Sequence, residues 1–345
     1  MLTFDPEALE RLVIQATGHR SAEVDAMPGG ASTRRYLRVR TPEGAPHGSL
    51  VAMFVPDGTP EEITAGGPTA RWPFLEVHAL LHAHGVRVPA LLAEDCERGL
   101  LLLEDLGDET LAAFLDRAPA RRAEIYRAAV TDLARAQRSL GALPEGSVVA
   151  TRAFDEKLLR WELDHFREWG LDARGQELAE ADRAGFDAIA DRLARRIAAW
   201  PRGFTHRDYQ SRNLMVRGGA GEAPELVWID FQDALLGPRV YDLVALLNDS
   251  YQSLDRAFMD ARLDEYAAAA GLDVAGREAL GREFDVVTVQ RKLKDAGRFV
   301  FIDRIKKNPG FLPYVEPSLA KVRGALARLQ DEPDMRELTR IVFLG

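Results

Sequence analysis

The stretch of sequence that decides the fold runs from Gly203 to Asp249 and reads GFTHRDYQSRNLMVRGGAGEAPELVWIDFQDALLGPRVYDLVALLND. It contains two short apolar runs, Leu214–Val216 and Leu226–Ile229, whose length and composition predict the two strands of a small hairpin. A polar cluster accompanies each run: His206-Arg207-Asp208 with Asn213 before the first, and Asp230-Phe231-Gln232-Asp233 after the second.

The spacing of these polar residues, H-R-D-x-x-x-x-N and then a strand that ends in D-F, is typical of phosphoryl transfer. It predicts that Asp208 is the catalytic residue that orients and deprotonates an acceptor hydroxyl. Asn213 and Asp230 are the predicted ligands of Mg²⁺, which prefers carboxylate and amide oxygens. Taken singly, the three residues also suit a turn, a cap and a strand end. Their shared spacing beside two strands favours the catalytic interpretation.

The composition indicates a globular protein large enough for two lobes that share a cleft. The chain has 345 residues, of which 46% are hydrophobic and 29% charged. Its net charge of −9 argues against nucleic acid as a partner. Cys96 is the single cysteine, so the chain can form neither an internal disulfide nor a metal site of the Cys/His type.

The beginning of the chain, MLTFDPEALERL, carries acidic residues rather than a basic leader. No run of about 18 apolar residues occurs, so no membrane-spanning segment is expected. We therefore expect a cytoplasmic protein, and no pattern in the sequence indicates an obligate protein partner.

Three strand candidates in the first part of the chain predict a small sheet that binds ATP: Glu23–Pro28, Arg35–Arg40 and Leu50–Val55. The turn between the first two consists of small residues, which let backbone amides approach a phosphate. Ser32 and Thr33 are therefore predicted to bind ATP, although an ordinary hairpin turn has the same composition.

The third strand lacks a lysine, whereas protein kinases place one there beside the nucleotide phosphates. Three arginines lie close by in the sequence, Arg34, Arg35 and Arg38. Arg35, directly after the turn, is the predicted replacement; the alternative is that all three are solvated strand residues. The segment Asp57–Arg71, rich in Gly, Pro and Thr, is predicted to be a loop at the edge of the cleft.

A second hairpin is predicted from the apolar runs Leu91–Glu94 and Leu100–Leu103. In a two-lobed kinase the chain would pass to the second lobe directly afterwards, so we place the boundary at Glu104. The carbonyl of Glu104 and the amide of Leu106 would then bind adenine. This gives a nucleotide-binding domain of residues 1–104 and a catalytic, substrate-binding domain of residues 105–345, the latter mainly helical.

The residues after Asp230 favour a small acceptor. A protein kinase carries an activation segment and an A-P-E motif there, which form a shelf for a peptide. This chain has no A-P-E motif, and Asp242 follows within a short stretch. Asp242 is expected to cap a helix or to hold the catalytic loop by a buried hydrogen bond.

Taken together, THRDYQSRNLMV, WIDFQDALLGPRVYDLVALLND, ASTRRY (31–36) and QRKLKDAGRF (290–299) resemble the aminoglycoside phosphotransferase/choline kinase superfamily. Within it, the chain is most similar to the bacterial anomeric kinases of N-acetylmuramate and N-acetylglucosamine. The resemblance implies an α+β, protein-kinase-like fold of two lobes, with a small antiparallel sheet and a large helical lobe. It also implies transfer of the ATP γ-phosphoryl group to the C1 hydroxyl of an amino sugar during cell-wall recycling, with Mg²⁺.

On this interpretation the residues around the catalytic groups bind the sugar: Tyr209, Gln210, Arg212, Gln232, Asp233 and Arg291. Each also suits a packing or charge-pairing role. Arg291, Lys294 and Arg298 share one face of a predicted helix, which suits a neutral or anionic sugar better than a cation. Two alternatives remain: another small-molecule kinase of the superfamily, for aminoglycosides, choline or homoserine, and a nucleotide-binding pseudokinase scaffold, suggested by the missing lysine.

Overall fold

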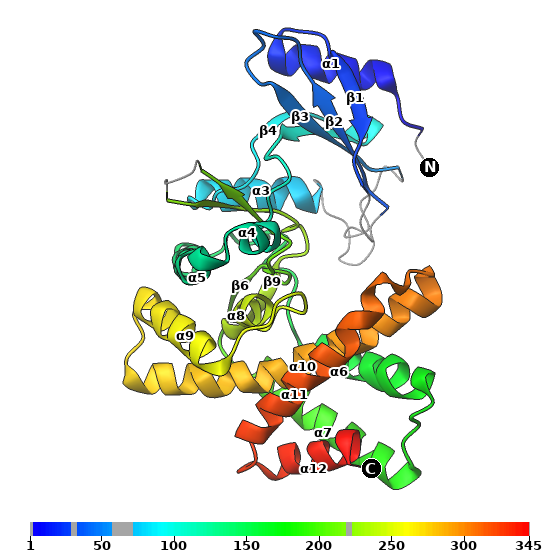
Figure 1. The fold of residues 1–345 in the computed structure, drawn as a ribbon, viewed down its shortest axis with the longest axis vertical. Helices are drawn as coiled ribbons and strands as arrows, with labels where there is room; N and C mark the ends of the chain where they lie inside the picture. Colours follow the sequence, from blue (N-terminus) through cyan, green and yellow to red (C-terminus); the bar gives the residue numbers. More distant parts are fainter. Residues whose placement is uncertain (1–2, 29–32, 57–71, 219–222, 345) are drawn as a thin grey trace. The chain divides into compact units, whose positions relative to one another are not determined.

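The computed structural model describes residues 3–28, 33–56, 72–218 and 223–344 (Figure 1). The chain packs into two compact units. The first consists of Met1–Thr110 and Leu214–Asp233, and the second of Leu111–Asn213 and Ala234–Gly345. The packing thus divides after Thr110 rather than at the predicted boundary, Glu104, and it assigns a later segment to the first unit. Ser32 and the Asp57–Arg71 loop lie outside the described residues.

The first unit is built on a five-stranded antiparallel sheet of order β1-β2-β3-β5-β4. Its strands are β1 (Glu23–Ala26), β2 (Arg35–Arg40), β3 (Ser49–Phe54), β4 (Leu91–Asp95) and β5 (Leu100–Glu104). All five were predicted, and their observed ends lie within two residues of the predicted ones. Because side chains alternate along a strand, each strand presents one set of residues to each face of the sheet.

Helix α1 (Pro6–Thr17) covers one face of this sheet. Asp5 caps its start by accepting hydrogen bonds from the amides of Glu7 and Ala8, and Gly18 ends it with a φ of 74°. Leu9, Leu12 and Val13 of α1 form a core with apolar residues of β2, β3 and β5. A second helix, α3 (Pro73–Ala83), belongs to the same unit and lies on the other side of the sheet in Figure 1.

The hairpin β7 (Leu214–Arg217) and β8 (Glu225–Trp228) is the later segment that joins the first unit. Its backbone is hydrogen-bonded to this unit at two places: the amide of Val216 donates to Glu109, and that of Trp228 to Arg87. Met215 and Val227 form a small apolar cluster with Leu106. These contacts explain why the hairpin packs with residues far from it in the sequence.

The second unit is mainly helical, as predicted. Its helices are α4 (Leu111–Arg117), α5 (Arg122–Ser139), α6 (Glu156–His165), α7 (Glu180–Ala198), α8 (Val240–Leu247), α9 (Arg256–Ala270), α10 (Val274–Lys306), α11 (Val315–Arg328) and α12 (Pro333–Phe343). Two strands, β6 (Arg202–Thr205) and β9 (Leu235–Pro238), pair antiparallel. The long helix α10 packs against α6, α8, α9 and α11 and forms the centre of this unit (Figure 1).

The predicted α+β class is confirmed, because a five-stranded antiparallel sheet is followed by a mainly helical remainder. Helix α6 begins at Glu156, after the capping residue Asp155, and a π-helical turn occupies Phe166–Leu171 directly after it. Within the described part of the chain, no helix combines the length and apolar character that a bilayer crossing requires.

Candidate active site

The loop after β6 carries the predicted catalytic residue and is fixed by hydrogen bonds to its backbone. The buried carboxylate of Asp242, at the start of α8, accepts hydrogen bonds from the amides of His206 at 2.7 Å and Arg207 at 2.9 Å. Nη1 of Arg291, on α10, donates to the Arg207 carbonyl at 2.7 Å. The expected role of Asp242 in holding this loop is confirmed, and the peptide groups on both sides of Arg207 are fixed.

Burial raises the pKa of Asp242 to about 7, against its two amide hydrogen bonds and the charge of Arg291. The two amides can only donate, so they favour the ionised carboxylate as their acceptor. The two amides therefore limit the rise that burial causes in the pKa of Asp242, and the same two hydrogen bonds fix the base of the loop.

Asp208 follows Arg207 and remains partly accessible, with 40% of its side chain exposed. Nη2 of Arg291, whose own side chain is 3% exposed, donates to Asp208 Oδ1 at 3.1 Å. Desolvation pushes the pKa of Asp208 upward, but the charges of Arg291, Lys294 and Arg207 outweigh it, so that the pKa lies below its usual value. Asp208 is therefore an ionised carboxylate that can accept a proton and is fixed in direction by Arg291.

Asn213 closes the same loop. Its Nδ2 donates to the carbonyl of Asp208 at 2.9 Å, and its amide donates to the carbonyl of Gln210. The first of these bonds orients the amide oxygen away from that carbonyl, as a Mg²⁺ ligand requires.

Asp230 belongs to the first unit, where it follows β8. It is exposed, has a φ of 63°, and accepts a hydrogen bond from Nε2 of Gln232 at 2.9 Å. An amide and a carboxylate suit Mg²⁺ when phosphate oxygens complete its coordination. In the described ranges, no group of three or more His, Cys, Asp or Glu side chains could hold a metal ion by itself. The assignment of Asn213 and Asp230 as a metal pair stays a prediction.

Tyr36 and Arg38 of β2 lie on the sheet face opposite α1. The Tyr36 hydroxyl is hydrogen-bonded to Arg34. Burial raises the pKa of the Tyr36 phenol; Arg34 opposes this rise and the Asp230 carboxylate adds to it. Arg34 is buried, so a fixed guanidinium and the Asp230 carboxylate both act on the Tyr36 hydroxyl.

Arg35, the predicted replacement for the missing lysine, is exposed and pairs with Phe54 across the sheet. Phe54 belongs to the core under α1, so the alternation of side chains places Arg35 on that face, away from Tyr36. Arg38 is on the face of Tyr36, but it is bound to Asp105 at 2.8 Å and Asp108 at 2.8 Å. The placement therefore favours Arg34 over both.

The residues predicted to bind adenine contribute to the packing of the first unit. The Glu104 carboxylate accepts hydrogen bonds from Arg87 at 2.6 Å and from the Ala90 amide at 3.0 Å. Leu106 is buried with Met215. Thr33 is exposed. The predicted adenine contacts involve the backbone at 104 and 106 and stay a prediction.

Two predicted sugar-binding side chains have other roles in the structure. Tyr209 is 0% exposed, and its hydroxyl donates to the carbonyl of Ala129, so it is a core residue and its predicted sugar contact is wrong. The exposed Arg212 lies over the ring of Tyr251 at 3.5 Å and donates to the Tyr314 hydroxyl. The Arg212 guanidinium thus contacts two tyrosine side chains.

Of the other predicted sugar-binding residues, Gln210, Gln232 and Asp233 lie beside the catalytic groups in sequence, whereas Arg291 lies on α10. Gln210 shapes the loop through its backbone, because its amide donates to the carbonyl of Asp208. Gln232 is buried and hydrogen-bonded to Asp230 and Asp233. Arg291, as described, binds Asp208 directly.

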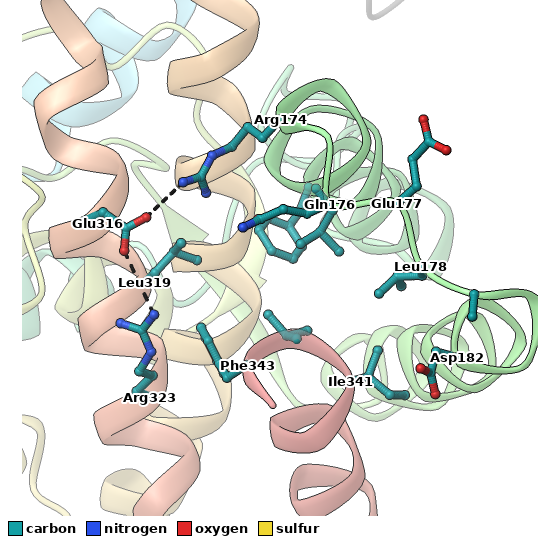
Figure 2. A pocket seen from close by; sticks show the side chains of 14 residues that line it. Arg174, Gln176, Glu177, Leu178, Asp182, Glu316, Leu319, Arg323, Ile341 and Phe343 are labelled. Carbon is teal, nitrogen blue, oxygen red and sulfur yellow. Dashed lines mark hydrogen bonds and ion pairs between the residues drawn. The ribbon is translucent and has the colours of Figure 1, made fainter. Parts of the chain in front are cut away.

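A cavity of about 520 Å³ lies elsewhere in the second unit, among α7, α11, α12 and the segment after the π-helical turn (Figure 2). Figure 2 shows Arg174 and Arg323 directed at Glu316, at 2.9 and 3.9 Å. None of the predicted site residues lines this cavity, so its size does not bear on the chemistry at Asp208.

The model of the phosphotransferase enzyme family (APH) matches residues 23–280. The chain belongs to this family. It is 35% identical over 324 residues to the N-acetylmuramate/N-acetylglucosamine kinase of Pseudomonas aeruginosa, with 92% of this chain and 88% of the relative covered. It is 33% identical over 328 residues to the protein of the same name from Pseudomonas putida, with coverage of 93% and 88%.

A solved structure supports the fold of this phosphotransferase. The GDP complex of aminoglycoside 2'-phosphotransferase-IIIa superposes with a TM-score of 0.61 and 14% sequence identity, over 94% of this chain and 100% of the other. At this identity the likeness shows the fold alone, which is of the protein-kinase-like type. Family and relatives together establish a phosphotransferase that acts on a hydroxyl acceptor.

Sequence reasoning missed several polar residues of this phosphotransferase. Arg34 could have been preferred to Arg35 from the alternation of β2 alone, since Tyr36 and Arg38 mark the polar face. Tyr241, whose ring centre lies 4.6 Å from the Arg291 guanidinium, is buried, and so are Lys292 and Glu162, which accepts a hydrogen bond from Gln290. Their sequence signal was weak, because a charged run on a helix ordinarily indicates a solvated face.

Proposed function

We propose that this phosphotransferase transfers the γ-phosphoryl group of ATP to the anomeric C1 hydroxyl of an N-acetylated amino sugar. The product is a sugar 1-phosphate, and the acceptor is N-acetylmuramate, N-acetylglucosamine or both. The observation that carries this proposal is the accessible, ionised Asp208 on a fixed loop, in a chain of which more than 90% aligns with relatives named N-acetylmuramate/N-acetylglucosamine kinase. We further propose a role in recycling cell-wall sugars in the cytoplasm.

The charge environment of Asp208 supports an anomeric acceptor. Arg291 lowers the basicity of the carboxylate, and a weak base is more effective toward an acidic hydroxyl than toward an ordinary one. The hydroxyl at C1 is the most acidic of a free sugar. In the proposed step its proton passes to Asp208 as the C1 oxygen bonds to the γ-phosphorus, and ADP leaves with the electrons of the broken P–O bond.

The first unit is proposed to bind the nucleotide through its face opposite α1. Arg34 would neutralise phosphate charge in place of the missing lysine, and Ser32 and Thr33 would contribute backbone amides. The backbone at Glu104 and Leu106 would bind adenine. Asn213 and Asp230 would hold Mg²⁺, which neutralises phosphate charge when bound.

The proposal is tested by incubating the protein with Mg·ATP and a panel of N-acetylmuramate, N-acetylglucosamine, choline and aminoglycosides. Phosphorus NMR distinguishes a phosphate on C1 from one on C6. We expect a C1 phosphate on at least one amino sugar and no product from choline or aminoglycosides. Phosphorylation at another carbon, or turnover of only the other acceptors, would overturn the proposal.

The matched variant is Asp208→Asn, which keeps the shape of the side chain and removes its basicity. We expect kcat to fall by about 10²–10⁴-fold, because a positioned general base contributes that much, while nucleotide binding measured by calorimetry is retained. Near-normal turnover by Asp208→Asn would remove Asp208 from the mechanism.

A further inference from the structure

A buried network of charged side chains extends from Asp208 along α10. Arg291, bound to Asp208, also has its Nε 4.0 Å from Oδ2 of Asp295. Asp295 pairs through Oδ2 with Lys292 at 2.8 Å and through Oδ1 with Lys294 at 2.9 Å. Three cations of one helix therefore share a single carboxylate, and this network reaches the proposed base.

These three cations differ in their accessibility. The side chains of Arg291 and Lys292 are 3% and 2% exposed, and Nζ of Lys292 also donates to Ser250 at 3.0 Å. Lys294 is 17% exposed, and its ion pair with Asp295 engages one of the three protons of its ammonium group. Lys294 is therefore the most exposed of the three cations.

Polar atoms without a hydrogen-bond partner gather near Lys294. Among the residues that the structure describes, Oη of Tyr241, Oε1 of Gln290 and Nε2 of His165 are buried in this way. All three side chains belong to residues more than nine-tenths buried. Lys294 acts electrostatically on both Tyr241 and His165. Buried polar atoms are rarely left without a hydrogen-bond partner in proteins. Core packing alone therefore does not account for the polar groups in this region.

Aromatic rings lie beside these groups. The ring of His165 stacks on Trp161 at 5.3 Å and lies 5.3 Å from Phe301. Trp161 is 53% exposed, which is unusual for a large apolar side chain. The guanidinium of Arg298, one helical turn after Lys294, lies 4.9 Å from the centre of Phe301. Aromatic faces with a few placed polar groups are the usual lining of a small-molecule site.

We propose that Lys294 binds the carboxylate of an acidic amino sugar whose C1 hydroxyl lies at Asp208. The proposal rests on the proposed function and deepens it, because it predicts selection of N-acetylmuramate over N-acetylglucosamine, which lacks a carboxylate. Lys294 is three residues from Arg291, a rise of about 4.5 Å along α10. This spacing places Lys294 one helical turn from the arginine that binds the base, so that a substituent of the same sugar ring can meet its ammonium group.

The test compares kcat/KM for the two sugars in wild type, Lys294→Met and Lys294→Gln. A charge-assisted hydrogen bond is lost with both substitutions, so we expect kcat/KM for N-acetylmuramate to fall by about 10- to 100-fold, mainly through KM. For N-acetylglucosamine, which makes no such bond, we expect a clearly smaller loss, common to both sugars, because the charge of Lys294 also acts on Asp208. Lys306→Met, which removes an exposed lysine from the last turn of the same helix, should leave both values unchanged.

The outcomes separate this proposal from the proposed function. Equal losses for the two sugars would assign Lys294 to the base or to the nucleotide and would overturn the proposal, as would unchanged values for both. The Gln variant retains a polar group for Asp295, so selectivity can be measured with it if the Met variant fails to fold. If wild type phosphorylates neither sugar, the proposed function itself fails.

Discussion

Arg207 and Asp230 hold backbone conformations that residues with a side chain rarely adopt, with φ of 80° and 63°. Such a conformation costs about 1–3 kcal/mol and persists only where the surroundings over-determine it. For Arg207 the surroundings are Asp242 and Arg291, which hydrogen-bond to the peptide groups on either side. The strain lies directly before Asp208 and at Asp230, two of the residues that the sequence predicted to act in the chemistry.

Neighbouring arginines allow a sharp test of the nucleotide site. Arg34→Ala is expected to raise the Kd for ATP by about tenfold, because one charge-assisted contact to phosphate is lost. Arg35→Ala, on the opposite face of β2, should change it by less than about threefold, as an exposed charge does. Calorimetric titration with Mg·ATP measures both, and thermal melting checks that the variants are folded. A larger effect at Arg35 would reverse the assignment.

His165 predicts a pH dependence of stability. Burial and the charges of Arg298 and Lys294 on α10 lower its pKa to about 4, and Glu162 lies one turn away on α6. The pKa of histidine in an unfolded chain is about 6.5. Below that pH, His165 is therefore protonated in the unfolded state but still neutral in the folded state. Stability from this group is complete above pH ~6.5 and is lost as the pH falls toward 4.

Between pH 7.5 and pH 5.0, His165 should therefore reduce the free energy of unfolding by about 2 kcal/mol. His165→Phe keeps a ring against Trp161 and cannot titrate, so the variant should lack this part of the pH dependence. Urea unfolding of both proteins at the two pH values provides the measurement. Identical pH dependence in the variant and in wild type would show that His165 is not held neutral.

At the scale of helices and strands, the sequence was sufficient to predict those elements that are determined by residues close together in the chain. The strands of the sheet agree with the ranges predicted from short runs of sequence, and α1 begins at the Asp5 cap and ends at Gly18. The π-helical turn Phe166–Leu171 was not foreseeable, because it depends on packing against a helix more than a hundred residues away. The same holds for Tyr209, whose burial is decided by α5 and not by its neighbours in the loop.

Gly297 on α10 is the residue that permits this packing. A Cβ there would lie 2.8 Å from the carbonyl oxygen of His165 and 2.8 Å from the Cα of Phe166, which are backbone atoms that cannot move independently. Gly297→Ala is therefore expected to reduce the free energy of unfolding by about 1–3 kcal/mol through overpacking.

Gly324 on α11 is the matched control, because the nearest atom to a Cβ there is the end of the Arg328 side chain at 3.6 Å. Gly324→Ala should increase stability by about 0.5–1 kcal/mol through helix propensity. Chemical denaturation measures both variants. The prediction fails if the two substitutions have effects of the same sign.

At the scale of the whole molecule, the chain passes between the two compact units after Thr110, after Asn213 and after Asp233. The residues up to Thr110 therefore do not form a complete unit. Without the hairpin and the residues that follow it, Leu106 would lose its packing contacts with Met215 and Val227. Phe74 would lose Phe231, since the centres of these two rings are 5.0 Å apart. A boundary at Glu104 in the sequence could not reveal this, since the missing contacts come from residues far along the chain.

We expect a fragment of residues 1–110 to be unfolded or only loosely packed at 25 °C. A second fragment, in which a flexible linker joins residues 1–110 to residues 214–233, should unfold cooperatively, because it restores this apolar cluster. Circular dichroism during urea titration distinguishes the two. A cooperative transition in the shorter fragment would show that the hairpin is dispensable for this unit.

The threefold passage of the chain also limits how such a protein can be recombined with its relatives. A single genetic crossover near codon 110 would combine a sheet from one parent with a hairpin from the other, although Val216 and Trp228 of that hairpin are hydrogen-bonded to Glu109 and Arg87. Intact inheritance of the first unit requires exchange of two separate gene segments. The two segments should consequently diverge in concert, each constraining which substitutions the other can accept.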